Sequence, residues 1–291
     1  MKIRKAVIPA AGLGTRVLPA TKAVPKEMIP IVDKPAIQYN VEEAVRSGIE
    51  EICIITSRGK SVVEDHFDRA PELEARLAEG GEAKRELLES VIYAAKCARI
   101  TYVRQQEQLG LGHAVMQARN FVGNEPFAVL YGDDVIIGDD PCCAQVCRAF
   151  EETGLGTVAI KEVTDEFIVK YSSMKCQLMY DNIYRITDMI EKPTLETKFS
   201  NFSILGRCAL PAEIFDILEN IPKGAGGEYQ LTDAMRKLAV TVGMTGVDFT
   251  GKRYDMGNKL GILEANIDVG LKLPETSVGL KAYLKEIAKK L

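Results

Sequence analysis

Strand-like and helix-like segments alternate along the first half of this 291-residue chain. Four short apolar segments are typical of buried strands, at residues 5–10, 51–56, 100–104 and 126–131. Segments with helical periodicity lie between them, at residues 35–47, 59–68, 71–95 (interrupted at Gly80–Gly81) and 112–120. Such alternation predicts a mostly parallel sheet flanked by helices, with its ligand crevice beyond the carboxyl ends of the strands.

The second half of the chain predicts a mixed extension of the same sheet. After a helix at 141–152, strand-like segments follow at residues 156–163, 175–179, 184–190, 202–210 and 244–249. Helices are expected at residues 211–220, 229–240, 258–271 and 279–290. Because no internal repeat or Pro/Gly/Ser-rich linker interrupts the chain, we predict one α/β domain over residues 1–272. Residues 273–291 are expected to form a helix that docks on the domain or contacts another subunit.

The charge of the chain excludes two broad classes of partner. With 37 basic and 41 acidic residues the net charge is −4, too small and of the wrong sign to hold nucleic acid or an anionic membrane. The longest apolar runs fall far short of the ~18 residues that span a bilayer. We therefore expect no nucleic-acid partner and no membrane span, and any phosphate ligand has to be held locally.

The cysteines and the N-terminus favour a cytoplasmic protein. Seven cysteines, an odd number, make a poor disulfide framework, and they include no second Cys/His pair for a zinc site. We expect buried or half-buried reduced thiols. The first five residues run into a strand without the apolar segment of a secretory signal.

A glycine turn, residues 10–16, directly follows the first predicted strand. Its residues Ala11, Gly12 and Gly14 let the backbone approach a ligand closely and turn N–H groups toward a base or phosphate. The turn has no Gly-Lys-Ser/Thr, and Val17 stands where a dinucleotide-binding loop needs a small residue. The glycines alone would also fit an ordinary tight turn.

Cations downstream of the turn favour the ligand-binding interpretation. Arg16, Lys22 and Lys26 lie in a proline-stiffened segment whose one nearby acid is Glu27. An arginine fork and mobile lysine charges can stabilise an α-phosphate and a departing pyrophosphate.

Acidic residues follow two predicted strands. Asp133 and Asp134 come after the strand at 126–131, and Asp255 stands between a strand and a helix. Carboxylates in these places commonly hold Mg²⁺ together with ligand phosphates. An acidic turn and a helix cap are the structural alternatives.

The sequence Glu191-Lys192-Pro193 ends another predicted strand. If it faces the crevice, Glu191 could accept hydrogen bonds from sugar hydroxyls and Lys192 could bind a sugar phosphate. A surface ion pair is the alternative. Because proline cannot continue a central strand, we predict that the strand stops near Lys192. The two histidines, His66 and His113, have no nucleophile partner in the sequence, so we interpret both as structural.

Six motifs, spread in order along nearly the whole chain, together resemble those of a known protein family. They are Gly12–Arg16, Pro25–Met28, Gly110–Val115, Glu191–Pro193, Gly224–Asp233 and Gly257–Gly261. With them the chain resembles the bacterial UTP:glucose-1-phosphate uridylyltransferases, or UDP-glucose pyrophosphorylases, of the sugar nucleotidyltransferase family. The resemblance implies a Rossmann-like nucleotidyltransferase fold and the Mg²⁺-dependent conversion of UTP and glucose 1-phosphate to UDP-glucose and pyrophosphate. It also implies a homo-oligomer, a homodimer or homotetramer.

The resemblance also implies roles for individual residues. Those expected to bind the nucleotide are Ala11, Gly12, Gly14, Gln105 and Gly110, with Arg16 and Lys26 as the catalytic phosphate contacts. Those expected around the metal and the sugar phosphate are Asp133 and Asp255 for Mg²⁺, and Glu191, Lys192, Tyr171 and Ile204 for glucose 1-phosphate. The sugar phosphate would attack the α-phosphorus of UTP in line, without an enzyme nucleophile.

Two segments depart from the family pattern near the sugar. Ser172 and Ser173 follow Tyr171 where many relatives have a glycine and an aliphatic residue, and Ser203 precedes Ile204 in place of alanine. The added hydroxyls leave the identity of the hexose open. A relative that uses another nucleotide or hexose 1-phosphate, or a catalytically silent paralogue that binds a nucleotide sugar, are the alternative functions.

Overall fold

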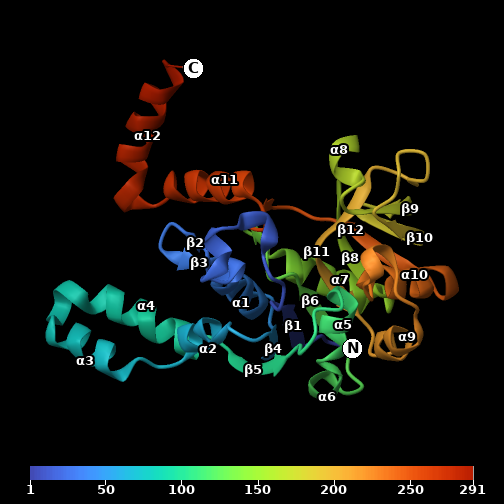
Figure 1. Ribbon diagram of the computed structural model, residues 1–291, viewed down its shortest axis with the longest axis horizontal. Coiled ribbons are helices and arrows are strands. Elements are labelled where there is room, and N and C mark those ends of the chain that lie inside the picture. Colours follow the sequence, from blue (N-terminus) through green and yellow to red (C-terminus); the bar gives the residue numbers. More distant parts are fainter. Residues whose placement is uncertain (291) are drawn as a thin grey trace.

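A nine-stranded sheet forms the centre of the protein in the computed structural model, which describes residues 1–290 (Figure 1). The strand order is β5 (Arg99–Arg104), β4 (Glu51–Thr56), β1 (Lys5–Pro9), β6 (Phe127–Leu130), β11 (Phe202–Leu210), β8 (Thr157–Glu162), β12 (Met244–Asp248), β10 (Ile183–Glu191) and β9 (Ser172–Tyr180). β10 and β11 run against the direction that the other strands share. This confirms the predicted mixed, mostly parallel sheet.

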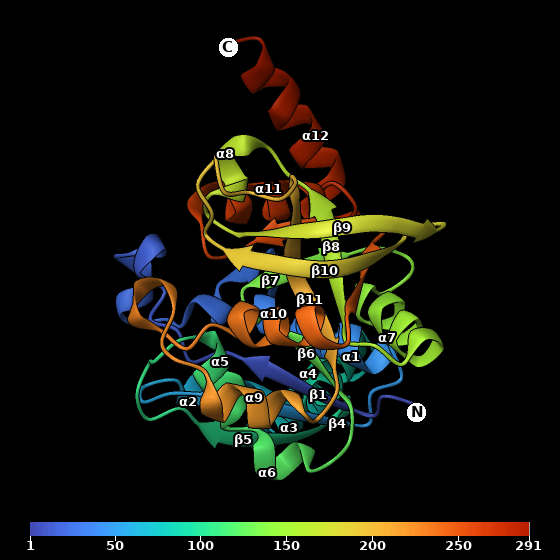
Figure 2. The same cartoon turned by 90° about the vertical axis from the view of Figure 1, so that its right-hand side faces the viewer.

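Helices cover both faces of the sheet because side chains alternate between the faces along each strand. Val7 of β1 joins the core on one face, whereas Ala6 and Ile8 join the core on the other. The first face is covered by α5 (Leu111–Met116), α9 (Ile214–Asn220) and α10 (Leu231–Thr241). The second is covered by α1 (Ala36–Arg46), α2 (Ser61–Phe67) and α7 (Cys142–Thr153). Figure 2 shows these layers from the side of β9 and β10.

Two helical arms extend away from the sheet (Figure 1). One is formed by α3 (Pro71–Glu79) and α4 (Arg85–Lys96), with the predicted break at Gly80–Gly81 between them. The other is formed by α11 (Lys259–Gly270) and α12 (Pro274–Ala288). The last helix was predicted to begin at residue 279, but α12 begins at Pro274. Proline is well tolerated in the first turn of a helix, so it does not prevent this earlier start.

A small two-stranded antiparallel sheet was not predicted from the sequence. It pairs β7 (Asp134–Ile137) with β13 (Lys252–Asp255) and places Asp134 opposite Asp255. Other short elements are β2 (Pro30–Ile31), β3 (Lys34–Pro35), α6 (Arg119–Val122) and α8 (Asp165–Ile168). Strands of two to four residues are too short to show an alternating pattern, which is why the sequence does not reveal them.

The cysteines are as predicted: all seven are free thiols, and each is buried or half-buried. Within residues 1–290 no helix combines the length and the apolar character needed to cross a membrane.

Candidate active site

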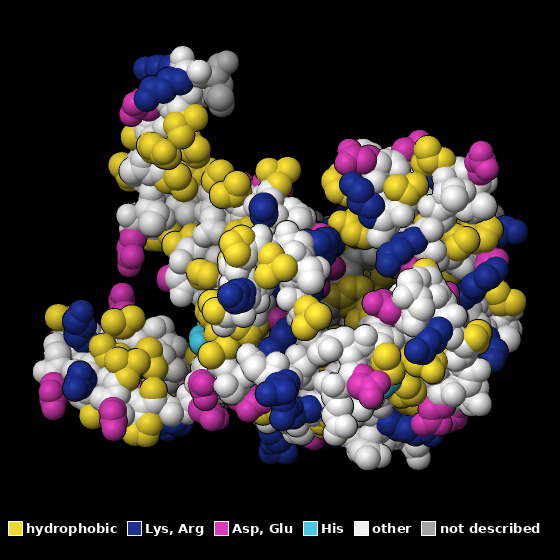
Figure 3. All heavy atoms as spheres, in the orientation of Figure 1, with side chains coloured by type: hydrophobic (Ala, Val, Ile, Leu, Met, Phe, Trp, Pro, Cys, Tyr) yellow, Lys and Arg dark blue, Asp and Glu magenta, His cyan; other side chains and the backbone are white. Residues whose placement is uncertain are grey.

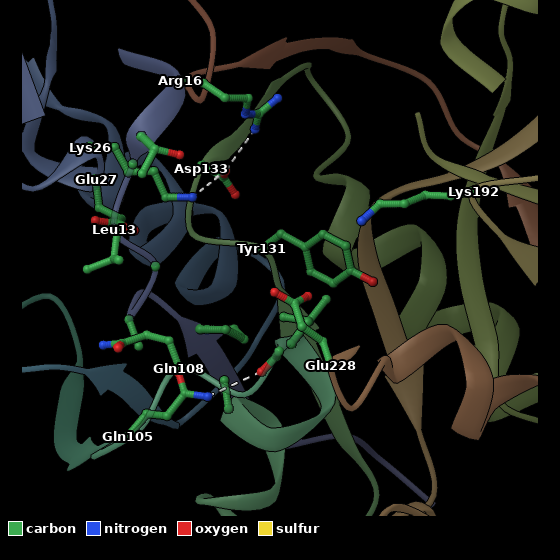
Figure 4. A pocket seen from close by; sticks show the side chains of 18 residues that line it. Leu13, Arg16, Lys26, Glu27, Gln105, Gln108, Tyr131, Asp133, Lys192 and Glu228 are labelled. Carbon is green, nitrogen blue, oxygen red and sulfur yellow. Dashed lines mark hydrogen bonds and ion pairs between the residues drawn. The ribbon is translucent and has the colours of Figure 1, made fainter. Parts of the chain in front are cut away.

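A hollow opens in the molecular surface beside the N-terminal loops (Figure 3). The principal cavity has a volume of about 710 Å³ and lies beyond the carboxyl ends of β1 and β6. Nine of the residues predicted for the site line it: Ala11, Gly12, Gly14, Arg16, Lys26, Gln105, Gly110, Asp133 and Lys192. Figure 4 shows the charged groups at one end of this cavity, with Gln105 and Gln108 at the other.

The glycine turn is held from behind by the loop after β4. Lys60 Nζ donates to the carbonyl of Ala10, and Ser57 Oγ donates to that of Ala11 at 3.0 Å. Gly14 has φ +68°, the left-handed region that favours glycine. A side chain at Gly12 would stand in ordinary contact with Lys26, 3.5 Å from its Nζ. The turn is thus a fixed, narrow wall of the cavity, as the ligand-binding interpretation requires.

Lys60 also forms a buried ion pair with Glu27, with Nζ 2.8 Å from Oε2. Burial raises the pKa of Glu27 and lowers the pKa of Lys60, although each charge favours the other. Because Glu27 directly follows Lys26, the pair fastens the cation-bearing segment η3 (Lys26–Met28) to the glycine turn.

Two cations and two carboxylates meet beside one end of the cavity, and Figure 4 shows Arg16 and Lys26 at Asp133. Lys26 Nζ lies 2.6 Å from Asp133 Oδ2. Arg16 lies between the carboxylates, 3.7 Å from Asp133 Oδ2 and 3.3 Å from Asp255 Oδ2. Burial opposes ionisation of Asp133, but the charges of Lys26 and Arg16 outweigh it and leave the pKa of Asp133 lowered. Asp133 is therefore ionised at neutral pH, and the two acids predicted as metal ligands do come together.

Gly257 leaves a gap between these carboxylates, and the guanidinium of Arg16 lies in it. A Cβ at this position would lie 3.0 Å from Asp133 Oδ2 and 2.9 Å from Asp255 Oδ1. Asp255 Oδ1 also accepts the Gly257 N–H at 2.8 Å. Within residues 1–290 no group of three or more His, Cys, Asp or Glu side chains could hold a metal ion alone. Two neighbouring carboxylates suit a Mg²⁺ ion that takes its other ligands from phosphates and water.

Asp134, next to Asp133, points to a different partner. Arg253 Nη2 lies 2.5 Å from Asp134 Oδ1, and both side chains are largely buried. Burial raises the pKa of Asp134, and the charge of Arg253 opposes the shift. Of the two neighbouring acids, Asp133 alone lines the cavity within the described chain.

At the sugar end, the prediction that the strand stops near Lys192 is confirmed. β10 ends at Glu191, and Lys192 has φ +48°. The Lys192 N–H donates to the carbonyl of Tyr171 at 2.7 Å. This turn sends the side chain of Lys192 into the cavity, facing Tyr131 (Figure 4).

Glu191 turns to α10, where its Oε2 accepts a hydrogen bond from Thr232 Oγ1 at 2.7 Å. Burial raises the pKa of Glu191, although Thr232 and Lys192 favour its charged form. Tyr171 donates from its hydroxyl to Asp255 Oδ2 at 3.3 Å, and Ile204 is 7% exposed within the core. In the part of the chain that the structure describes, these residues and Asp255 lie outside the lining of the 710 Å³ cavity.

Among the lining residues that had no role assigned from the sequence are Gln108, Tyr131 and Glu228. Glu228 projects into the cavity toward Tyr131 (Figure 4). Two sequence signals pointed to these positions. Tyr131 directly precedes the acidic turn, and Glu228 belongs to the motif at Gly224–Asp233.

Comparison with known proteins adds an independent line of evidence. Residues 5–270 match the model of a family described as nucleotidyl transferase. A UTP–glucose-1-phosphate uridylyltransferase of Staphylococcus epidermidis is 49% identical over 286 residues, 98% of this chain and 99% of the relative. A crystal structure of UDP-glucose pyrophosphorylase complexed with UDP-glucose has a TM-score of 0.85 and 40% identity, covering 93% of this chain and 100% of that one. A UTP-bound UGPase from Acinetobacter baumannii has a TM-score of 0.88 and 36% identity, covering 98% and 99%.

Proposed function

The chain belongs to the nucleotidyl transferase family, and from this premise we propose that it transfers the uridylyl group of UTP to glucose 1-phosphate, giving UDP-glucose and pyrophosphate. The observation that carries the proposal is the cavity in which Arg16, Lys26 and Asp133 stand at one end and Lys192 approaches from another element. Relatives that carry this activity in their names match almost the entire chain.

The lining of the cavity supports direct transfer. Among the described residues that line it, none is a serine, cysteine or histidine. We propose that the phosphate of glucose 1-phosphate attacks the α-phosphorus of UTP directly, forming the new P–O bond as the bond to pyrophosphate breaks. The protein's part is to align the two substrates and to stabilise charge.

Arg16 and Lys26 are proposed to bind the phosphates of UTP. Their present partners are carboxylates, and a polyphosphate offers the same hydrogen bonds with more charge. Ala11, Gly12, Gly14, Gln105 and Gly110 would hold the uridine, since they form the walls at that end.

Members of this family generally use a divalent metal. We propose Mg²⁺ here, held by Asp133 and Asp255, where it would neutralise charge on the phosphates. Arg16, now lying between these acids, would turn to the phosphates.

The binding site for the second substrate, glucose 1-phosphate, is assigned to the turn after β10. Lys192 would bind the phosphate of glucose 1-phosphate, because its ammonium group reaches the cavity without an acidic partner in the described chain. Glu191 would accept hydrogen bonds from glucose hydroxyls, with Thr232 holding its other oxygen. Tyr171 and Ile204 would shape the sugar pocket.

The projecting helix α12 is proposed to contact a second copy of the chain in a homodimer or homotetramer. None of its described residues is buried, and Val278 and Tyr283 are 79% and 60% exposed. Apolar side chains in such number on one projecting helix favour a protein contact. The reduced thiols favour a cytoplasmic setting.

The assay that tests the function is pyrophosphate release from UTP, glucose 1-phosphate and Mg²⁺. Parallel reactions with dTTP and with galactose 1-phosphate identify the preferred substrates. Turnover with UTP and glucose 1-phosphate above the other pairs supports the proposal. Nucleotide binding without turnover of any pair would instead identify a silent paralogue.

A further inference from the structure

The Gly110–Val115 motif places His113 behind a residue of the cavity wall. Gln105 is 3% exposed, and its amide Nε2 lies 2.9 Å from His113 Nδ1 and 3.2 Å from the carbonyl oxygen of Gly110. Both contacts are within hydrogen-bond distance. A side-chain amide has two N–H donors on its nitrogen, so these two acceptors use both of them.

The carbonyl of Gly110 shows which way the amide of Gln105 faces. A carbonyl oxygen can only accept, so the amide group beside it has to be the nitrogen. The Oε1 of Gln105 then remains as its one group without a hydrogen bond in the described chain. Because Gln105 lines the cavity, that oxygen is the group offered to a ligand.

The same orientation fixes the tautomer of His113. If Nδ1 accepts from Gln105, the proton of the neutral ring is on Nε2. The other neighbour of the ring, Gln117, has its Nε2 3.3 Å from His113 Nε2 and donates to the His113 carbonyl at 3.1 Å. The opposite tautomer would turn Gln105 Oε1 against the Gly110 carbonyl, bringing two acceptors together. The shorter ring contact, at 2.9 Å, is the one to Gln105.

A donor stands beside the acceptor that Gln105 offers. The N–H of Gly110 makes no hydrogen bond within residues 1–290, and Gly110 lines the same end of the cavity. No side chain fits at this position, because a Cβ would lie 2.7 Å from Glu228 Cβ and 2.8 Å from the Tyr229 carbonyl. One acceptor next to one donor complements a base edge that carries a ring N–H next to a carbonyl.

We propose that His113 is a specificity-determining positioning residue, which fixes the Gln105 amide so that the cavity accepts bases with a protonated ring N3, uracil and thymine, and rejects cytosine. This inference rests on the proposed function, in which this end of the cavity holds the base. Cytosine has an unprotonated N3 and would set one acceptor against another. A buried acceptor that meets no donor weakens binding of the ligand that leaves it so.

The test compares kcat/KM for UTP, dTTP and CTP in the wild type, His113→Leu and His113→Asn. Leucine removes one of the two acceptors that hold the Gln105 amide, so only the Gly110 carbonyl remains to orient it. Asparagine Oδ1 can accept in place of Nδ1. We expect His113→Leu to lower the UTP-to-CTP ratio by tenfold or more, mainly through KM, and His113→Asn to keep most of the wild-type ratio. An unchanged ratio in a folded His113→Leu enzyme would overturn the proposal, as would equal losses with all three nucleotides.

A second measurement needs no change at His113. The chain has two histidines, so nitrogen NMR of the wild type, assigned with His66→Gln, reports the His113 ring directly. We expect an unprotonated Nδ1 and a protonated Nε2 in the neutral ring. A protonated Nδ1 would overturn the proposal even if His113→Leu does not fold. Failure of the proposed function would show differently, as a wild type that does not turn over UTP.

Discussion

The guanidinium of Arg207 and the carboxylate of Glu43 form an ion pair with Nη2 2.6 Å from Oε2, and their side chains are 0% and 4% exposed. Arg207 also donates to the Asp134 carbonyl at 3.0 Å and to Asn40 Oδ1 at 2.8 Å. Asn40 in turn donates to the carbonyl of Gly132 at 3.1 Å. The pair therefore anchors the backbone of the turn that presents Asp133 to the cavity.

Replacing Glu43 by glutamine should destabilise the fold strongly, because it leaves the buried Arg207 charge without a counter-charge. Breaking a buried pair in this way typically costs about 3–5 kcal/mol. Urea unfolding at neutral pH measures the change. Glu50→Gln is the matched control, since its partner Arg4 and Glu50 itself are 53% and 48% exposed, and it should change the free energy of unfolding little. Similar losses in both variants would contradict the anchoring role.

Asp133→Asn and Asp255→Asn should each reduce turnover severely while the protein stays folded. Each change keeps the size of the side chain but removes a charge that Mg²⁺ needs. Pyrophosphate release over a Mg²⁺ titration provides the measurement, and circular dichroism checks the fold. Near-normal turnover of both variants at low millimolar Mg²⁺ would show that these acids do not hold the metal.

Gly257→Ala should raise the Mg²⁺ concentration needed for half-maximal activity. The added methyl would enter the gap between Asp133 and Asp255, at 3.0 Å and 2.9 Å from their oxygens, and would also displace the guanidinium of Arg16 from it. Gly279→Ala, in α12, is the control, because a Cβ there meets nothing within 4 Å. If both variants respond to Mg²⁺ like the wild type, the gap is not the metal site.

Glu191 and Lys192, at the end of β10, should affect the binding of different parts of glucose 1-phosphate. Lys192→Ala should mainly raise the KM for glucose 1-phosphate, because it removes a positive charge from the phosphate site. Glu191→Gln should mainly reduce the preference for glucose 1-phosphate over galactose 1-phosphate. Steady-state kinetics with both sugars separate the effects. Identical profiles for the two variants would refute this division of roles.

His66 should contribute to the pH dependence of stability. Burial lowers the pKa of His66 below its ordinary value of 6.5. As the pH falls through 6.5, the unfolded chain takes up a proton first, so the free energy of unfolding should decrease until the lower folded-state pKa is passed. Each unit of pKa difference corresponds to about 1.4 kcal/mol. Urea unfolding from pH 8 to pH 5 should show this decrease in the wild type but not in His66→Gln; equal slopes would count against it.

The sheet and much of the site could be predicted because their signals are local. The apolar runs of β1 and β4 and the glycine turn after β1 are visible in consecutive residues. The same holds for the strand end at Glu191, which Pro193 marks. In each case one short segment carries the physical cause of its own conformation.

Other features depend on residues far apart in the sequence. The small sheet of β7 and β13 pairs two segments of four residues each, and neither segment shows a periodic pattern alone. Likewise, nothing local distinguishes Asp133 from Asp134. The distinction comes from Arg253 of β13, which pairs with Asp134 of β7. Tertiary contacts decide such details, so a single sequence does not reveal them.

Arg16 and Asp255 meet across 239 positions of the chain. All strands of the central sheet precede β13, which carries Asp255. During translation, a chain that has just passed β12 can complete its sheet and glycine turn, but it still lacks one of the two proposed metal ligands. The order of the elements thus separates completion of the sheet from completion of the proposed metal site, and a product truncated before β13 would lack Asp255 although it carries every strand of the sheet.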